Sequence, residues 1–274
     1  MATMIKGINL WTFDRKTSIA EAAKAAREAG FEAIEPTLEA KGKLTPKTTE
    51  AKCRELGQTI RDAGLQIASL ACGLFWETSY ASPDPKVREQ AYQLTIAGLD
   101  RARWIGSPVL LVVPGVVRRA KTKTLEIGYA DALAFSCDML KNLAYEAATR
   151  GVIVAIENVW DNILISPVET REFIDRINSP WVGVYFDVGN VMRYGVPQDW
   201  ITTLAQRIVR VHLKDFQLDA GNRNGFCSLG EGDVDWAAVV AALQSIGYQG
   251  PLTYEGPGEP ADISSRIDRI LKLL

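Results

Sequence analysis

Residues 152–190 have the sequence VIVAIENVWDNILISPVETREFIDRINSPWVGVYFDVGN. A nearly continuous apolar run over 152–157 is followed by an amphipathic stretch over 166–178 and by a second apolar run over 183–187. Continuous apolar runs are typical of parallel strands that are covered on both faces, and a helix between two such strands completes a β-α-β unit. This stretch therefore predicts an α/β fold with a parallel sheet.

The same alternation extends along the whole chain. Eight apolar runs predict strands over 6–11, 33–36, 66–71, 108–113, 152–157, 183–187, 208–213 and 252–255. Amphipathic stretches predict helices over 17–29, 48–64, 84–106, 129–151, 166–178, 197–206, 234–247 and 261–274. Eight β-α units without a break in composition predict one (β/α)8 TIM barrel, a single domain over 1–274. The rival is a doubly wound open sheet, which usually has a glycine-rich loop after its first strand, and none follows Trp11.

Composition excludes several classes of protein. The net charge of −2 argues against a nucleic-acid-binding face and a polybasic membrane patch, and the basic stretch at 118–123 is interpreted as a solvated loop. No apolar run is long enough to span a membrane, and residues 1–10 lack the pattern of a signal peptide. The four cysteines are irregularly spaced without a CxxC pair, which argues against a disulfide framework or a zinc ribbon. A cytoplasmic protein is expected.

Metal-capable side chains stand at the ends of four consecutive predicted strands. They are Glu157, Asp187, His212 and Glu255, and His212 is the only histidine of the chain. Taken singly, a strand-end aspartate often caps the next helix, and a lone histidine is more often packed in a core. In a TIM barrel, however, the C-terminal ends of all strands meet at one mouth, where the chemistry takes place. The joint pattern therefore predicts that the four side chains converge.

Three carboxylates and one imidazole form a hard, oxygen-rich ligand set. Such a set suits one divalent cation, with Mn²⁺ as the first choice and Mg²⁺, Co²⁺ or Zn²⁺ as alternatives. A cation held by a carbonyl oxygen and a neighbouring hydroxyl acidifies the C–H bond between them and stabilises the resulting enediolate. One nearby carboxylate then removes the proton and another returns it. The predicted substrate is a small sugar or sugar phosphate.

Further residues near the same mouth are candidate substrate contacts. Trp11 and Trp160 follow strand ends, where aromatic rings suit the apolar faces of sugars, although plain packing is an alternative. Glu35 could bind a substrate hydroxyl or stand behind the site. Lys214 could neutralise a phosphate, polarise a carbonyl, or pair with a neighbouring carboxylate. Asp233 is expected to cap the helix that follows it.

At these motifs the sequence resembles the xylose-isomerase-like barrel superfamily of sugar isomerases and epimerases. It is most similar to the branch of ketose 3-epimerases and sugar-phosphate epimerases. The matching segments are GFEAIE (30–35), AIEN (155–158), FDVGN (186–190), VHLKD (211–215), LGEGDVDW (229–236) and YEG (254–256). The resemblance implies a metal held by Glu157, Asp187, His212 and Glu255. It also implies that Glu157 and Glu255 are the catalytic acid/base pair, and that the chain forms a homodimer or homotetramer.

Two departures from the family pattern concern the substrate. Asn190 stands where free-sugar 3-epimerases commonly have a second histidine. Residues 216–218 lack an arginine that usually holds substrate hydroxyls, which leaves Arg223 as the nearest candidate. The resemblance implies a ketose or ketose-phosphate 3-epimerase. The alternatives are a dehydratase (lyase) of an inosose or keto-sugar on the same site, a hydroxypyruvate-type aldose–ketose isomerase, and a non-catalytic sugar sensor. The single histidine and the near-neutral net charge argue against a DNA-repair endonuclease of the same superfamily, whose zinc cluster is rich in histidine.

Overall fold

The computed structural model describes residues 4–118 and 124–272. Most of the basic stretch predicted as a solvated loop therefore lies outside the described residues, as do the last two residues of the final predicted helix. Within these ranges the strands are β1 (Ile5–Asn9), β2 (Ala33–Glu35), β3 (Thr37–Leu38), β4 (Gln66–Ile67), β5 (Ala71–Cys72), β6 (Val109–Val112), β7 (Ile153–Glu157), β8 (Val182–Asp187), β9 (Ile208–Leu213), β10 (Asp215–Phe216), β11 (Phe226–Cys227) and β12 (Pro251–Tyr254). The helices are α1 (Ile19–Glu28), α2 (Glu50–Asp62), α3 (Pro85–Ile105), α4 (Tyr129–Arg150), α5 (Pro167–Ile177), α6 (Val188–Val191), α7 (Pro197–Leu204), α8 (Trp236–Ser245) and α9 (Pro260–Leu271).

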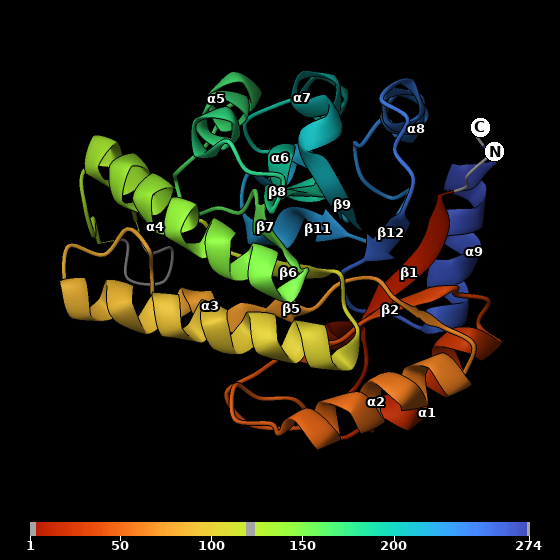
Figure 1. Cartoon of the computed structure of the whole chain (residues 1–274). Coiled ribbons are helices and arrows are strands. Elements are labelled where there is room, and N and C mark those ends of the chain that lie inside the picture. The colour runs from red at the N-terminus through yellow and green to blue at the C-terminus, as the bar shows by residue number, and fades with distance from the viewer. Residues whose placement is uncertain (1–3, 119–123, 273–274) are drawn as a thin grey trace.

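The central feature is a curled parallel sheet of eight strands, in the order β4-β2-β1-β12-β9-β8-β7-β6 (Figure 1). The first strand, β1, pairs with both β2 and the last strand, β12. This order follows the chain around the sheet, whereas in a doubly wound sheet the order of strands reverses. All eight predicted strands are confirmed, although the third is shorter than expected. The fold is therefore α/β with an eight-stranded parallel sheet.

The two edge strands of this sheet approach each other. Leu70, which follows β4, forms a parallel bridge with Leu110 of β6. The backbone N–H of Leu70 donates to the carbonyl of Val109 at 2.8 Å, and the N–H of Leu111 donates to the carbonyl of Leu70 at 2.9 Å. These hydrogen bonds connect the residue after β4 to the opposite edge strand, β6.

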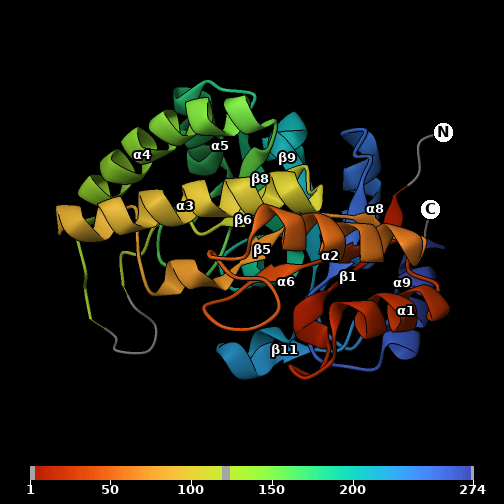
Figure 2. The same cartoon turned by 60° about the horizontal axis from the view of Figure 1, so that its bottom comes forward.

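The helices cover the outer face of the sheet. Helices that follow one another pack side by side, as Figure 2 shows for α2, α3 and α4. The eight predicted helices are confirmed with small shifts at their ends. Ser18 caps α1, since its hydroxyl accepts from the N–H of Glu21 while the Glu21 carboxylate accepts from the N–H of Ser18. The short helix α6 was not predicted. Among the helices of the described residues, none is both long enough and apolar enough to traverse a lipid bilayer.

Two apolar clusters support the site. The larger cluster fills the space between the sheet and the helices and extends into the loops above the sheet. The smaller cluster lies on the inner face of the sheet and consists of Ala71, Val109, Leu111, Ala155 and Tyr185. Interiors packed in this way resist deformation, so side chains that project from the strand ends above the inner cluster are held in fixed positions.

The pairing between β8 and β9 shifts by one residue between Val184 and Tyr185, so that Asp187 pairs with His212. Continued without the shift, the register would place Val211 beside Asp187. Successive side chains of a strand point to opposite faces, so a slip of one residue exchanges which of them face the interior. The irregularity therefore turns His212 inward, next to Asp187.

A buried aspartate organises the loop that leads from β10 to α8. Asp215 accepts hydrogen bonds from the N–H of Gly230 at 2.7 Å and from the indole N–H of Trp236 at 3.0 Å. The expected cap at Asp233 is wrong. Asp235 caps α8 by accepting from a backbone N–H in its first turn, whereas the Asp233 carboxylate lies within the loop and accepts from another backbone N–H. Both aspartates precede α8, and the folded loop places Asp235 and not Asp233 at the N-cap position.

Candidate metal and substrate site

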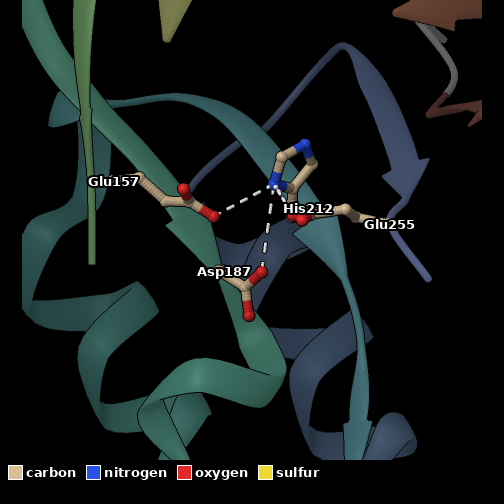
Figure 3. Close-up of side chains that lie close together, drawn as sticks. All are labelled: Glu157, Asp187, His212 and Glu255. Atoms are coloured by element: carbon tan, nitrogen blue, oxygen red, sulfur yellow. Dashed lines mark hydrogen bonds and ion pairs between the residues drawn. The ribbon is translucent and has the colours of Figure 1, made fainter. Parts of the chain in front are cut away.

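The four residues predicted to converge lie together at the C-terminal ends of β7, β8, β9 and β12 (Figure 3). One ligand atom from each lies within 4.8 Å of those of the other three. Nδ1 of His212 is 3.2 Å from Oε1 of Glu157, 3.9 Å from Oδ2 of Asp187 and 3.0 Å from Oε2 of Glu255. The side chains point toward one another, and all are buried except Glu255, which is partly exposed.

These distances fit a shared cation. Ligand atoms sit about 2.0–2.5 Å from a divalent ion, so two ligands of one ion are separated by roughly 3–5 Å. Oδ2 of Asp187 and Oε2 of Glu255 are buried and accept no hydrogen bond of good geometry from the described residues, although Nζ of Lys214 lies 3.0 Å and 2.8 Å from them. Buried carboxylate oxygens are costly without a compensating donor or positive charge. The donor set therefore fits one hard divalent cation.

The two oxygens of Asp187 have different functions. Oδ1 accepts the backbone N–H of Asn190 at 2.7 Å and so caps α6, while Oδ2 points toward His212. From the sequence, Asp187 could either cap the next helix or belong to the cluster, and in the structure it does both. Asn158 holds the backbone of Asp187 in place, because its amide accepts the N–H of Asp187 at 2.8 Å and donates to its carbonyl at 2.9 Å. Asn158 therefore fixes the strand end that carries Asp187.

Lys214 stands between the cluster and the solvent-facing side of the site. Its ammonium pairs with Asp187 and Glu255 at the ends of neighbouring strands, and not with the adjacent Asp215. The ion pair that the sequence offered as one alternative for Lys214 is therefore present. Together with His212 it surrounds the carboxylate of Glu255 with positive charge. The ammonium thus lies beside the cluster, and Lys214 also lines the cavity described below.

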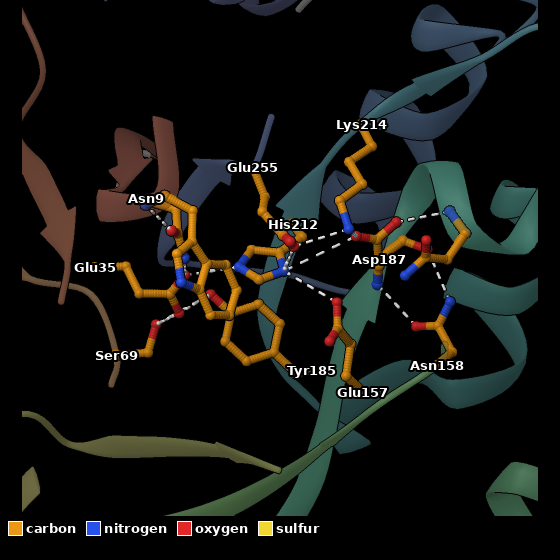
Figure 4. Close-up of polar contacts among 12 residues, drawn as sticks. Asn9, Glu35, Ser69, Glu157, Asn158, Tyr185, Asp187, His212, Lys214 and Glu255 are labelled. Carbon is orange, nitrogen blue, oxygen red and sulfur yellow. Dashed lines mark hydrogen bonds and ion pairs between the residues drawn. The ribbon is translucent and has the colours of Figure 1, made fainter. Parts of the chain in front are cut away.

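A second layer of polar groups lies behind the imidazole (Figure 4). Nε2 of His212 is 2.8 Å from Oε2 of Glu35, which is fully buried. The hydroxyls of Ser69 and Tyr185 donate to the other oxygen of Glu35 at 2.6 Å and 2.8 Å. Glu35 does not line the cavity described next. Its position argues against a direct contact with substrate and favours the alternative of a residue behind the site.

A cavity of about 290 Å³ opens beside the cluster. Its lining includes both glutamates of the cluster and five of the six predicted substrate contacts, namely Trp11, Trp160, Asn190, Lys214 and Arg223. Sequence reasoning did not single out Cys72 and Phe226, which also line it. Neither residue carries a local pattern that could have identified it, because both lie in two-residue strands whose contact with the cavity depends on the tertiary fold.

Trp11 and Trp160 differ in how freely they face the cavity. The ring of Trp160 stacks on Phe226 at a centroid distance of 5.2 Å, and the guanidinium of Arg193 lies 4.8 Å from its centre. Its indole N–H donates to the carbonyl of Asn190 at 2.8 Å. Trp160 is therefore a packed wall of the cavity. Trp11 is 38% exposed and has more open ring surface toward the cavity.

The electrostatic surroundings shift the pKa values of Glu157 and Glu255 in opposite directions. Burial, together with the nearby charge of Glu255, raises the pKa of Glu157 to about 7 despite the hydrogen bond to His212. For Glu255, burial acts in the same direction but is outweighed by the positive charges of Lys214 and His212, which hold its pKa below the usual range. Carboxyl groups whose pKa values are pushed apart can take the separate parts of acid and base. The carboxyl group of Glu157 therefore takes up a proton more readily than that of Glu255.

The chain belongs to the xylose isomerase-like TIM barrel family, whose sequence model matches residues 23–273. This confirms the resemblance found in the motifs. The chain is 25% identical to a putative L-ribulose-5-phosphate 3-epimerase, SgbU, of Escherichia coli over 84% of its own length and 80% of the relative. It is 26% identical to a ketose 3-epimerase of Arthrobacter globiformis over 90% of its length and 80% of the relative. Among solved structures, a D-tagatose 3-epimerase-like protein superimposes with a TM-score of 0.80 at 21% identity, covering 98% of each chain, which shows a shared fold.

Proposed function

We propose that this chain is a metal-dependent sugar epimerase or isomerase that acts on a ketose or a ketose phosphate, of the 3-epimerase type. The curated relatives named above are 3-epimerases, one putatively of a sugar phosphate. The observation that carries the proposal is the meeting of Glu157, Asp187, His212 and Glu255 beside a cavity that both glutamates line. The cavity volume of about 290 Å³ is near the lower end of the range for small-molecule sites, which suits a monosaccharide.

The proposal includes a closed barrel that forms a single domain over the whole chain. It is supported by the hydrogen bonds between Leu70 and β6, which join the two edges of the sheet, and by the pairing of β1 with β12. Closure matters for function, because it brings the ends of all eight strands around one mouth.

The four clustered residues would hold one divalent cation, with Mn²⁺ as the first choice. A cation in this place would supply positive charge next to the carbonyl and neighbouring hydroxyl oxygens of a ketose, which makes the intervening C–H bond more acidic. The ammonium of Lys214, close to Asp187 and Glu255, adds a second positive charge and a hydrogen-bond donor for a substrate oxygen.

Glu157 and Glu255 are the proposed catalytic pair. In the order of strands they occupy the two ends of the row β7-β8-β9-β12, with Asp187 and His212 between them. Carboxylates at opposite ends of the row can approach a bound sugar from different sides. One removes the proton from the carbon next to the carbonyl, and the other delivers a proton to the opposite face, which inverts that carbon.

The remaining contacts are assigned to substrate binding. Trp11 and Trp160 form apolar walls, and Asn190, Lys214 and Arg223 present polar or charged groups to the same cavity. An arginine and a lysine in one cavity can hold either sugar hydroxyls or a phosphate. Free ketoses and their phosphates are therefore both part of the test.

The test begins with metal analysis of the purified chain, followed by assays with ketoses, ketose phosphates and inososes in D₂O. Mass spectrometry of recovered sugar detects deuterium at the exchanged carbon, and chromatography identifies the epimer. An epimerase gives a deuterated product of the same composition. An unsaturated product with new ultraviolet absorbance would instead indicate a dehydratase. No deuterium uptake by any compound of the panel in the presence of Mn²⁺, Mg²⁺, Co²⁺ or Zn²⁺ would refute the proposal.

A further inference from the structure

His212 is the only histidine in the chain, and both of its ring nitrogens face carboxylates. Either nitrogen could therefore carry the proton of the neutral ring. Nδ1 faces the oxygens of Glu157, Asp187 and Glu255, whereas Nε2 faces Glu35 alone. A neutral imidazole carries its proton on one nitrogen and a lone pair on the other. A nitrogen can bind a cation only through a lone pair, so the position of this proton decides which nitrogen can be a ligand.

The surroundings of Glu35 require it to be an acceptor at both oxygens. The side-chain carbonyl of Asn9 accepts the backbone N–H of Trp11 at 2.6 Å, which leaves the NH₂ group of Asn9 to donate to Oε2 of Glu35. Oε1 accepts the hydroxyls of Ser69 and Tyr185. All of these side chains are fully buried, so no solvent replaces a missing partner. A carboxylate surrounded by donors in this way accepts, and does not provide, the proton toward His212.

We infer that Glu35 is a positioning residue that keeps the proton of His212 on Nε2 and thereby presents the Nδ1 lone pair to a cation held by Glu157, Asp187 and Glu255. The inference rests on the proposed metal site. Histidine ligands commonly donate their second ring N–H to a carboxylate, which fixes both the tautomer and the orientation of the ring. Here the carboxylate comes from β2, on the far side of β1 and β12 from the strand β9 that carries the histidine.

The packing around the ring supports the same orientation. The ring of Tyr185 lies 4.2 Å from the imidazole, centre to centre, and its hydroxyl binds the same carboxylate that faces Nε2. A half-turn of the ring about the Cβ–Cγ bond would put carbon atoms in the places of both nitrogens, so it would break the contact with Glu35 and remove Nδ1 from the cluster. Glu35 thus contacts the Nε2 edge of the imidazole, and the Tyr185 ring packs against its face.

A chain with a single histidine permits a direct measurement of the tautomer. Untagged protein labelled with ¹⁵N at histidine gives the signals of one imidazole, and two-bond ¹H–¹⁵N correlations identify the nitrogen that bears the proton. In the protein loaded with diamagnetic Mg²⁺ or Zn²⁺, we expect a protonated Nε2 and an unprotonated Nδ1 whose shift changes on addition of the ion. A proton on Nδ1 in the loaded protein would overturn the inference.

Variants separate positioning from a merely structural contribution. Glu35→Gln keeps the shape of the side chain and removes its charge, and we expect it to weaken cation binding by about 10- to 100-fold in calorimetry. Ser69→Ala is the matched control, because it removes one buried hydrogen bond from the oxygen of Glu35 that does not face His212. We expect a change of less than about threefold for the control. Equal weakening in both variants, or unchanged affinity in Glu35→Gln, would contradict the inference.

The same experiments distinguish this inference from the proposed function. If the wild-type chain binds none of the divalent cations, the proposed metal site fails. The tautomer of the metal-free protein, measured at alkaline pH where the ring is neutral, then decides the present inference. A proton on Nε2 would keep Glu35 as the residue that orients the ring, and a proton on Nδ1 would overturn that as well. The wild-type spectra keep the inference falsifiable even if Glu35→Gln does not fold.

Discussion

Replacing Glu255 with glutamine is expected to abolish turnover while the fold persists. Oε2 of Glu255 lies 3.0 Å from Nδ1 of His212 and 2.8 Å from Nζ of Lys214, and its side chain is 18% exposed, so it borders both the cluster and the cavity. An amide keeps one oxygen that can face a cation but cannot transfer the proton, and loss of a general acid or base typically costs about 10²- to 10⁴-fold in kcat.

The cost to stability is smaller, and its size follows from the contacts that remain. After the change, Lys214 still pairs with Asp187 at 3.0 Å, so its ammonium is not left without a counter-charge. The variant loses the negative charge that pairs with Lys214 and His212 at a partly exposed position, which corresponds to about 1–3 kcal/mol of the free energy of unfolding. Urea denaturation followed by circular dichroism measures this loss.

The assay is deuterium uptake and epimer formation from the ketose or ketose phosphate that the wild type converts best, at a saturating concentration of the cation. Glu259→Gln is the matched control, because it makes the same chemical change four residues further along at an exposed position outside the cavity lining. The control is expected to retain wild-type turnover. A Glu255→Gln enzyme whose kcat stays within about tenfold of the wild type would refute the role given to this carboxylate.

Three further outcomes are expected. Since the pKa of Glu157 is raised to about 7, cation binding below that pH must displace a proton, and the apparent affinity for the cation should fall as the pH is lowered. Calorimetry in buffers of different ionisation enthalpy should show proton release. An affinity that does not depend on pH, without proton release, would contradict this prediction. Asn158→Ala removes both hydrogen bonds to the backbone of Asp187 and should lower the free energy of unfolding by about 2–4 kcal/mol, measured by urea denaturation. A loss below about 1 kcal/mol would show that these two hydrogen bonds are not needed to hold the strand end. In Gly189→Ala the new Cβ would lie 2.6 Å from Cβ and 2.9 Å from the carbonyl oxygen of Lys214. We therefore expect the free energy of unfolding to fall by about 1–3 kcal/mol and the Tm to decrease. An unchanged Tm would mean that α6 can move to make room.

The chain order of strands and helices could be predicted because the apolar pattern of each element is local. For the same reason the four clustered residues could be named, since a parallel barrel brings the C-terminal ends of all its strands to one mouth. The sequence left open whether Glu35 binds a substrate hydroxyl or stands behind the site, because no local pattern around residue 35 or residue 212 indicates that the two are in contact. Its partners Asn9 and Ser69 were not singled out, since a polar residue within a strand can face either side.

The sequence by itself determined that the chain alternates strands and helices and that an aspartate, a histidine and two glutamates stand at successive strand ends. Only the tertiary structure decided that Asp187 and His212 face each other, because the one-residue shift between β8 and β9 arises from how two strands pair and not from either strand alone. It also decided that Nε2 of His212 meets Glu35 while Nδ1 meets the cluster. The physical reason is that side-chain periodicity is a property of a single segment, whereas register and ring orientation depend on contacts between residues far apart in the chain.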